Sequence, residues 1–166
     1  MNIVNKVDAS GLVTIDPADF FPKGERVLFD LKPLLVDEFL LKEKDFREFV
    51  KEHGWESYSG KFVAVTCSND AIIPVWAYML VSSALEPYAN EIFLGTLEEM
   101  EKHLFTESLS KINASDFTDQ RIVIKGCGDI PVPISAYVDL TKILKPVVKS
   151  IMYGEPCSTV PVYKRK

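Results

Sequence analysis

The chain has 166 residues, of which 47% are hydrophobic and 26% are charged, values typical of a globular protein with a sizeable core. Its formal net charge of −5 opposes attraction to nucleic acid or to an anionic membrane surface. The sequence contains neither an apolar run of bilayer-spanning length nor an apolar signal segment at its start. We therefore expect a cytoplasmic protein that binds neither nucleic acid nor membranes.

Residues 1–60 predict a flanking layer of short strands and one helix. LVTIDP (12–17) is typical of a strand that ends in an Asp-Pro turn, and RVLFDL (26–31) predicts a second strand. The spacing of apolar residues over 43–53 predicts an amphipathic helix, which Gly54 would end.

Residues 61–166 alternate between apolar strands and helices. Strands are predicted at KFVAVTC (61–67), EIFLG (91–95), RIVIKG (121–126) and SIMYG (150–154), with a last edge strand at VPVY (160–163). Helices are predicted between the first four of these strands. Near-continuous valine and isoleucine runs of this kind indicate a mostly parallel sheet with helices on both faces. The predicted fold is a three-layer α/β sandwich, organised most simply as one compact domain over 1–166.

An internal repeat runs through this second segment. Eight residues recur identically 59 positions later: Asp70, Pro74, Ala77, Tyr78, Leu85, Pro87, Ile92 and Gly95 match Asp129, Pro133, Ala136, Tyr137, Leu144, Pro146, Ile151 and Gly154. The repeat indicates a duplicated βαβ unit. The alternative is that two unrelated βαβ units acquired similar residues because they pack in the same way.

All three cysteines follow predicted strands. Cys67 lies in TCSND, Cys127 in KGCGD and Cys157 in GEPCST. Ligands of parallel sheets bind at the carboxyl edge of the strands, where the following helices also begin. If the strands formed one sheet, the three thiols would converge on one crevice.

Such convergence predicts a metal or reactive-thiol site, with zinc or iron as the candidate ion. The proposed ligands are Cys67, Cys127, Cys157, Asp70 and Asp129. The same loops would add ligand-binding groups from Ser68, Asn69, Gly126, Gly128 and Glu155. The spacing of the cysteines matches no standard metal motif.

Three other interpretations remain open. Cys127 at a helix amino terminus suits thiol chemistry without a metal, although neither His53 nor His103 is placed to act as its base. Alternatively, the loop amides bind a small anionic ligand at the two helix amino termini. The third possibility is an assembly subunit without a site, for instance a homodimer. The sequence assigns no enzyme class, substrate or catalytic residue.

The segment GCGDIPVPISAYVDLTKILKPVVKSIMYGEPCSTVPVYKRK (126–166) resembles a family of short cytosolic bacterial proteins known only as a domain of unknown function. The likeness extends over most of the chain. It implies no assigned reaction and no known site residues.

Overall fold

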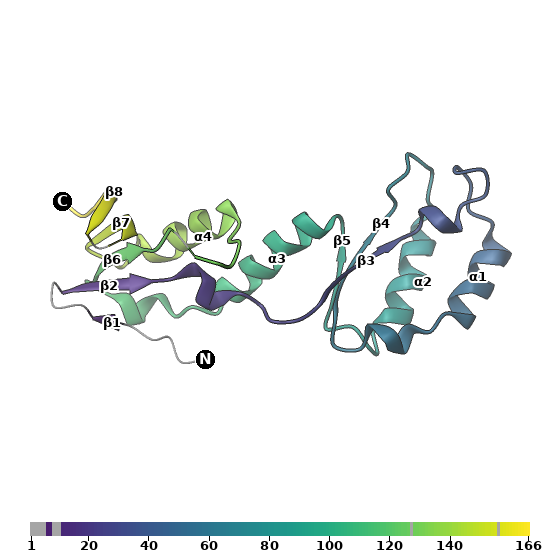
Figure 1. Ribbon diagram of the computed structural model, residues 1–166, viewed down its shortest axis with the longest axis horizontal. Helices are drawn as coiled ribbons and strands as arrows, with labels where there is room; N and C mark the ends of the chain where they lie inside the picture. Colours follow the sequence, from purple (N-terminus) through teal and green to yellow (C-terminus); the bar gives the residue numbers. More distant parts are fainter. Residues whose placement is uncertain (1–5, 8–10, 127, 156) are drawn as a thin grey trace. The chain divides into compact units, whose positions relative to one another are not determined.

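The computed structural model describes residues 6–7, 11–126, 128–155 and 157–166 (Figure 1). The chain divides into two compact units: unit 1 contains residues 1–22 and 101–166, and unit 2 contains residues 23–100. Each unit has its own sheet. This division differs from the expected segments 1–60 and 61–166, because residues 1–60 supply strands to the sheets of both units.

Unit 2 contains a three-stranded parallel sheet. Its order is β3-β4-β5, made of β3 (Arg26–Asp30), β4 (Phe62–Thr66) and β5 (Glu91–Leu94). Two α-helices, α1 (Glu43–Glu52) and α2 (Val75–Leu85), connect consecutive strands, together with the 3-10 helices η2 (Lys32–Leu34) and η3 (Trp55–Tyr58). Right-handed crossovers between neighbouring parallel strands place both helices on the same face of the sheet, as Figure 1 shows.

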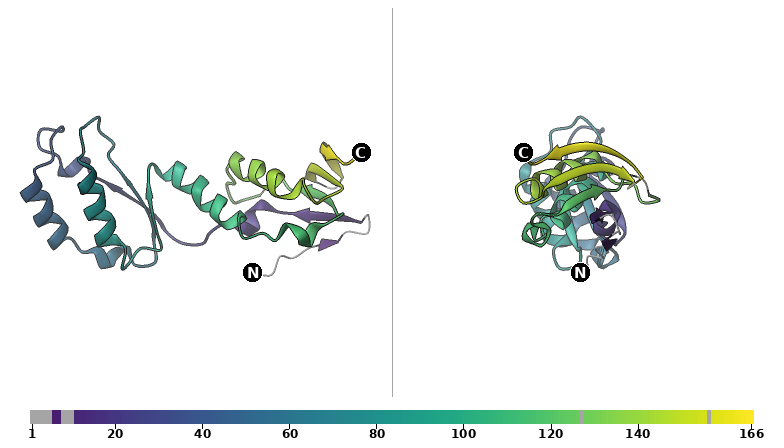
Figure 2. Two further views of the ribbon diagram at one scale, coloured as in Figure 1. Left: turned by 180° about the vertical axis from the view of Figure 1, so that it is seen from behind. Right: turned by 90° about the vertical axis from the view of Figure 1, so that its left-hand side faces the viewer.

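Unit 1 contains a five-stranded sheet of order β1-β2-β6-β7-β8. The strands are β1 (Lys6–Val7), β2 (Leu12–Ile15), β6 (Arg121–Ile124), β7 (Ser150–Glu155) and β8 (Ser158–Lys164). The three central strands are parallel, whereas β1 and β8 pair antiparallel at the edges. Figure 2 shows β7 and β8 side by side as a curved hairpin at the C-terminal end.

Unit 1 contains α4 (Ile134–Leu144) and the 3-10 helices η1 (Pro17–Phe20) and η4 (Ala114–Phe117). It also contains α3 (Leu97–Leu109) from residue 101 on, while the first four residues of that helix belong to unit 2. Its core joins Phe105 of α3 and Leu140 of α4 to alternate residues of the strands, such as Ile122 and Ile124 of β6. Because alternate strand residues share a face, both α-helices pack on one face of this sheet.

Unit 2 is built in the same way. Val63 and Val65 of β4 pack with Phe46 of α1 and with Ala77 and Val81 of α2 in a second core. The predicted α/β class with mostly parallel strands is therefore confirmed. The strands form two sheets instead of the single sheet that we expected. In each unit, the core lies between one sheet and one layer of helices.

The repeat of the sequence coincides with a repeat of elements. The elements η3, β4, α2 and β5 begin at residues 55, 62, 75 and 91, and η4, β6, α4 and β7 begin 59 residues later, at 114, 121, 134 and 150. One copy lies in each unit. Descent from a duplicated ancestor remains a prediction that this correspondence supports.

In the part of the chain that the structure describes, every helix is too short or too polar to cross a bilayer.

Candidate functional site

The two cysteine-bearing loops follow strands of different sheets. Cys67 follows β4 in unit 2, whereas the loop around residue 127 follows β6 in unit 1. The expectation of one shared carboxyl edge was therefore wrong. The reason is non-local: β3 pairs with β4, while β2, from near the start of the chain, pairs with β6.

The loop of unit 2 is held by its own polar side chains. Asp30, at the end of β3, accepts hydrogen bonds from the Ser68 N–H at 2.9 Å and from the Ser68 hydroxyl. The Asn69 amide donates to the carbonyl oxygen of Glu38. The Cys67 thiol donates to the carbonyl oxygen of Asn69 at 3.5 Å, and Asp70 is exposed. Ser68 and Asn69 therefore have structural partners.

The carboxylate of Asp30 is stabilised in its charged form. Desolvation alone would raise its pKa, but the hydrogen bond from the Ser68 hydroxyl and those from the N–H groups of Lys32 and Ser68 outweigh this effect. The pKa of Asp30 lies below its ordinary value as a result. In the same unit, burial raises the pKa of Tyr78, and neighbouring Cys67 adds to this shift.

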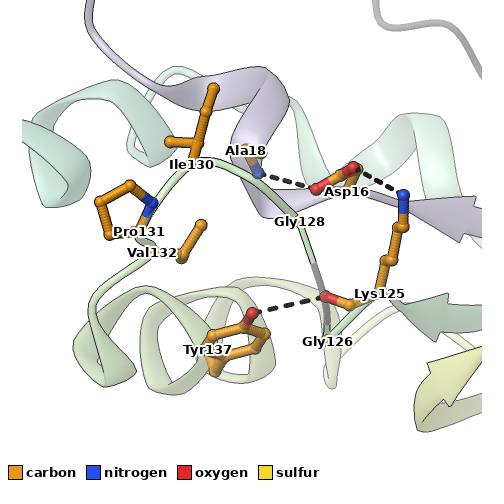
Figure 3. Close-up of a pocket in the computed structure, with 9 residues that line it drawn as sticks. All are labelled: Asp16, Ala18, Lys125, Gly126, Gly128, Ile130, Pro131, Val132 and Tyr137. Atoms are coloured by element: carbon orange, nitrogen blue, oxygen red, sulfur yellow. Dashed lines mark hydrogen bonds and ion pairs between the residues drawn. The ribbon is translucent and has the colours of Figure 1, made fainter.

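The corresponding edge of unit 1 carries a cavity of about 320 Å³, which we call the carboxyl-end pocket (Figure 3). It lies where β2 and β6 end and where the loop 125–133 leads into α4. Its lining residues are Asp16, Ala18, Lys125, Gly126, Gly128, Ile130, Pro131, Val132 and Tyr137. Polar groups of two neighbouring strands thus meet apolar loop residues in one enclosed volume.

Asp16 and Lys125 form an ion pair in this pocket. Asp16 follows β2 and caps η1, since its Oδ1 accepts a hydrogen bond from the N–H of Ala18 at 2.9 Å. Its Oδ2 lies 3.5 Å from Nζ of Lys125. The Asp16 side chain is 28% exposed and that of Lys125 36%, so both groups remain accessible to a ligand.

Tyr137 forms one wall of the pocket. Its hydroxyl donates to the carbonyl oxygen of Lys125 at 3.4 Å, as Figure 3 shows. Its ring meets that of Tyr153 edge-on, with ring centroids 5.7 Å apart. Tyr153 in turn lies against Gly126, where an added Cβ would be 2.5 Å from Cζ of the tyrosine. Only glycine fits at position 126 while Tyr153 keeps this place.

The two copies of the repeat carry different residues at these positions. Gly126 corresponds to Cys67, and Tyr153 corresponds to Leu94, each 59 positions earlier. In unit 2 the loop residue is the larger cysteine and the strand residue is the smaller leucine. In unit 1 the loop residue is glycine and the strand residue is the larger tyrosine.

The other predicted site residues of unit 1 lie around this edge. Gly128 lines the pocket and Asp129 is exposed in the same loop. Glu155 ends β7, the strand beside β6, and Cys157 is exposed in the turn before β8. Cys127 lies outside the described residues. The predicted metal ligands Cys67 and Asp70 belong to unit 2. The predicted ligands therefore do not all lie at the edge of one sheet.

Within the residues that the structure describes, no three histidine, cysteine, aspartate or glutamate side chains cluster as a metal site would require. The cysteine at position 127 is not among those residues, so the zinc or iron site remains a prediction.

Sequence reasoning did not identify Asp16, Lys125 or Tyr137 as site residues. The available signal for Asp16 was the Asp-Pro pair directly after a strand, a pattern typical of a cap at a helix start. Lys125 is the residue after β6 and carried no distinctive pattern. Tyr137 stood out only as a member of the repeat, and its side chain packs against the core of unit 1.

Comparison of the chain with curated proteins and with solved structures finds no match in either set. A family model described as "Protein of unknown function (DUF2480)" matches residues 1–165. This match spans both units, so the two sheets together make up the family's domain. The chain therefore belongs to the DUF2480 family of proteins of unknown function.

Proposed function

We propose that the protein binds a small molecule through an anionic group in the carboxyl-end pocket of unit 1. The observation that carries this proposal is the pocket itself, a cavity of about 320 Å³ that brings Lys125 beside the glycine-containing loop before α4. Ligands of parallel α/β sheets bind at this edge. The proposal favours anion binding over the three-cysteine site, because Cys67 follows a strand of the other sheet.

One feature of the pocket, Lys125, and one feature of the chain next to it, the start of α4, favour an anion. Lys125 has three N–H donors, and its ion pair with Asp16 occupies one of them. The helix α4 begins directly after the loop, and its N-cap is Pro133, whose side chain contains no acceptor for the first N–H groups of the helix. These groups and the helix dipole favour a negative charge beside the helix start.

Unit 2 lacks this arrangement at the corresponding loop. There, the Asp30 carboxylate accepts hydrogen bonds from Ser68 and from the backbone N–H of Lys32, and the residue corresponding to Lys125 is Thr66. We propose that the loop of unit 1 serves binding and that the loop of unit 2 serves stability.

Calorimetric titration with acetate and with inorganic phosphate tests this function. We expect Lys125→Gln to weaken binding of both anions about tenfold, because it removes the only cationic side chain among the residues that line the pocket. Lys51→Gln is the control, since it removes the same charge from an exposed position of α1 in unit 2. Equal effects of the two substitutions would refute the proposal.

A reactive thiol in the same loop is the second candidate function. Cys127 lies in the sequence between Gly126 and Gly128, which both line the pocket, and two residues after Lys125. A nearby cation and a helix amino terminus favour the reactive thiolate form. In a Cys67→Ser, Cys157→Ser background, we expect rapid alkylation by iodoacetamide at neutral pH and slower alkylation after Lys125→Gln. Alkylation as slow as that of free cysteine would refute this candidate.

A zinc or iron site remains a further proposal, with the predicted ligands Cys67, Cys127, Cys157, Asp70 and Asp129. Self-association as a homodimer is another. Metal analysis of protein purified without oxygen tests the first, with loss of metal expected in Cys127→Ser. Sedimentation at several concentrations tests the second.

A further inference from the structure

A second cavity adjoins the carboxyl-end pocket. It has a volume of about 330 Å³ and lies between α4 and the strands β7 and β8. We call it the apolar groove; it is lined by Ile124, Ile134, Tyr137, Thr141, Ile151, Met152, Tyr153 and Val162. Tyr137 belongs to the linings of both cavities.

The surface of the groove is almost entirely apolar. Ile151 and Ile124, which are 1% and 3% exposed, form its floor. Ile134 and Val162, which are 82% and 54% exposed, stand at its walls. The hydroxyl of Thr141 already donates to the carbonyl oxygen of Tyr137 at 2.8 Å. Exposed apolar side chains beside a buried apolar floor are typical of a groove that binds an apolar group.

Two tyrosines separate the cavities. The ring of Tyr137 faces the carboxyl-end pocket beside Gly126 (Figure 3) and meets Tyr153 of the groove edge-on. Tyr153 also lies against Gly126 of the pocket. Tyr137 is therefore a wall common to the pocket that contains Lys125 and to the apolar groove.

We propose that the two cavities form one site for an amphipathic ligand, with a carboxylate in the carboxyl-end pocket and an aliphatic chain in the apolar groove. This inference rests on the proposed function and specifies the ligand class. Burial of each methylene of the chain adds to affinity, while the anionic group fixes its orientation.

Unit 2 provides an internal control for this proposal. Val75 of α2 corresponds to Ile134 and is 74% exposed. The sheet of unit 2 ends at β5, however, so the part of it that the structure describes has no counterpart of β8, which supplies Val162 to the groove. Ile134 therefore faces a groove with a second apolar wall, whereas Val75, at the corresponding position, has no such wall from a strand like β8.

Calorimetric titration of the full chain with octanoate, acetate and octanol tests the proposal. We expect octanoate to bind at least about tenfold more tightly than acetate, since its chain adds apolar contact. Ile134→Ser and Val162→Ser, at the two walls, should each weaken octanoate binding about fivefold and leave acetate binding unchanged. Val75→Ser should change neither, and circular dichroism would verify that all variants fold.

The outcomes separate this inference from the proposed function. If octanoate and acetate bind with equal affinity and Lys125→Gln weakens both, the amphipathic ligand is refuted and the anion site is retained. Octanol binding as tightly as octanoate, with no effect of Lys125→Gln, would overturn both, as would the absence of any binding. A dimer that Ile134→Ser dissociates and octanoate does not affect would assign the groove to a second copy and overturn the inference.

Discussion

The ring of Tyr153 lies against Gly126, so that the end of strand β7 and the loop after β6 fit together without space for a side chain at residue 126. The contact lies beside the carboxyl-end pocket, and the ring of Tyr137 meets that of Tyr153 edge-on. The corresponding residues of unit 2, Cys67 and Leu94, show that the repeat permits the opposite distribution of volume.

We expect Gly126→Ala to destabilise the protein by about 1 kcal/mol or less, because the new Cβ meets the outer end of the half-exposed Tyr153 ring, which must shift. In a Tyr153→Leu background the same substitution should cost much less, since leucine leaves room for the methyl group. Urea unfolding of the four proteins measures this coupling. An equal cost of Gly126→Ala in both backgrounds would contradict the packing described here.

The two roles of Asp16 can be separated by substitution. Asp16→Ala removes both the cap of η1 and the ion pair with Lys125, and should cost about 1 kcal/mol of unfolding free energy. Asp16→Asn keeps an oxygen that accepts from the N–H of Ala18 and should cost roughly half of that or less, because an accessible ion pair contributes little. Urea unfolding at neutral pH measures both. The assignment fails if the asparagine variant is as unstable as the alanine variant.

Asp30 should make the stability of the protein depend on acid pH. Its folded-state pKa lies below the ordinary value of 3.8, so its contribution is fully present above that value. The contribution is lost as the pH falls through the lower, folded-state pKa, where the folded protein also takes up the proton.

Ser68→Ala should therefore reduce this acid-dependent part of the stability, since the Ser68 hydroxyl donates to Asp30. Thermal unfolding followed between about pH 2 and pH 6 measures the effect. Ser83→Ala, at an exposed position of α2, is the control. A Ser68→Ala variant with the acid profile of the wild type would show that this hydrogen bond does not stabilise the carboxylate.

Cys157 and Cys67 should differ in their reaction with dithionitrobenzoate. Cys157 is exposed, whereas Cys67 is partly buried against the core of unit 2 and donates to the carbonyl oxygen of Asn69. We expect Cys157 to react at least about tenfold faster, because reaction requires access to the sulfur. In a Cys127→Ser background, the fast phase should disappear on adding Cys157→Ser and the slow phase on adding Cys67→Ser. The reverse assignment would contradict the burial of Cys67.

Most of the helices and strands could be predicted from the sequence, because local patterns carry their signal. The strand predicted at 61–67 is β4 (Phe62–Thr66), and the helix predicted over 43–53 is α1 (Glu43–Glu52). The offset of 59 residues predicted which later elements correspond to the earlier ones. Membership in a family without an assigned function was also recognisable from the C-terminal segment.

The candidate site was only partly predictable. The sequence identified the loop at Gly126 and Gly128, since a glycine pair after a strand is a local signal. It did not identify Asp16, whose partner Lys125 is more than a hundred residues later in the chain. A contact at such a distance depends on which strands pair, and local patterns contain no information about that pairing.

The sequence by itself thus determined the α/β class, the repeated elements and the loops that follow their strands, because hydrophobic periodicity and glycine and proline positions act over a few residues. Only the tertiary structure decided that β2 joins β6 while β3 joins β4. That pairing placed Cys67 and the loop of Gly126 on different sheets and brought Asp16 to Lys125. Strand order follows from the burial of whole sheet faces by the folded chain, which no single segment specifies.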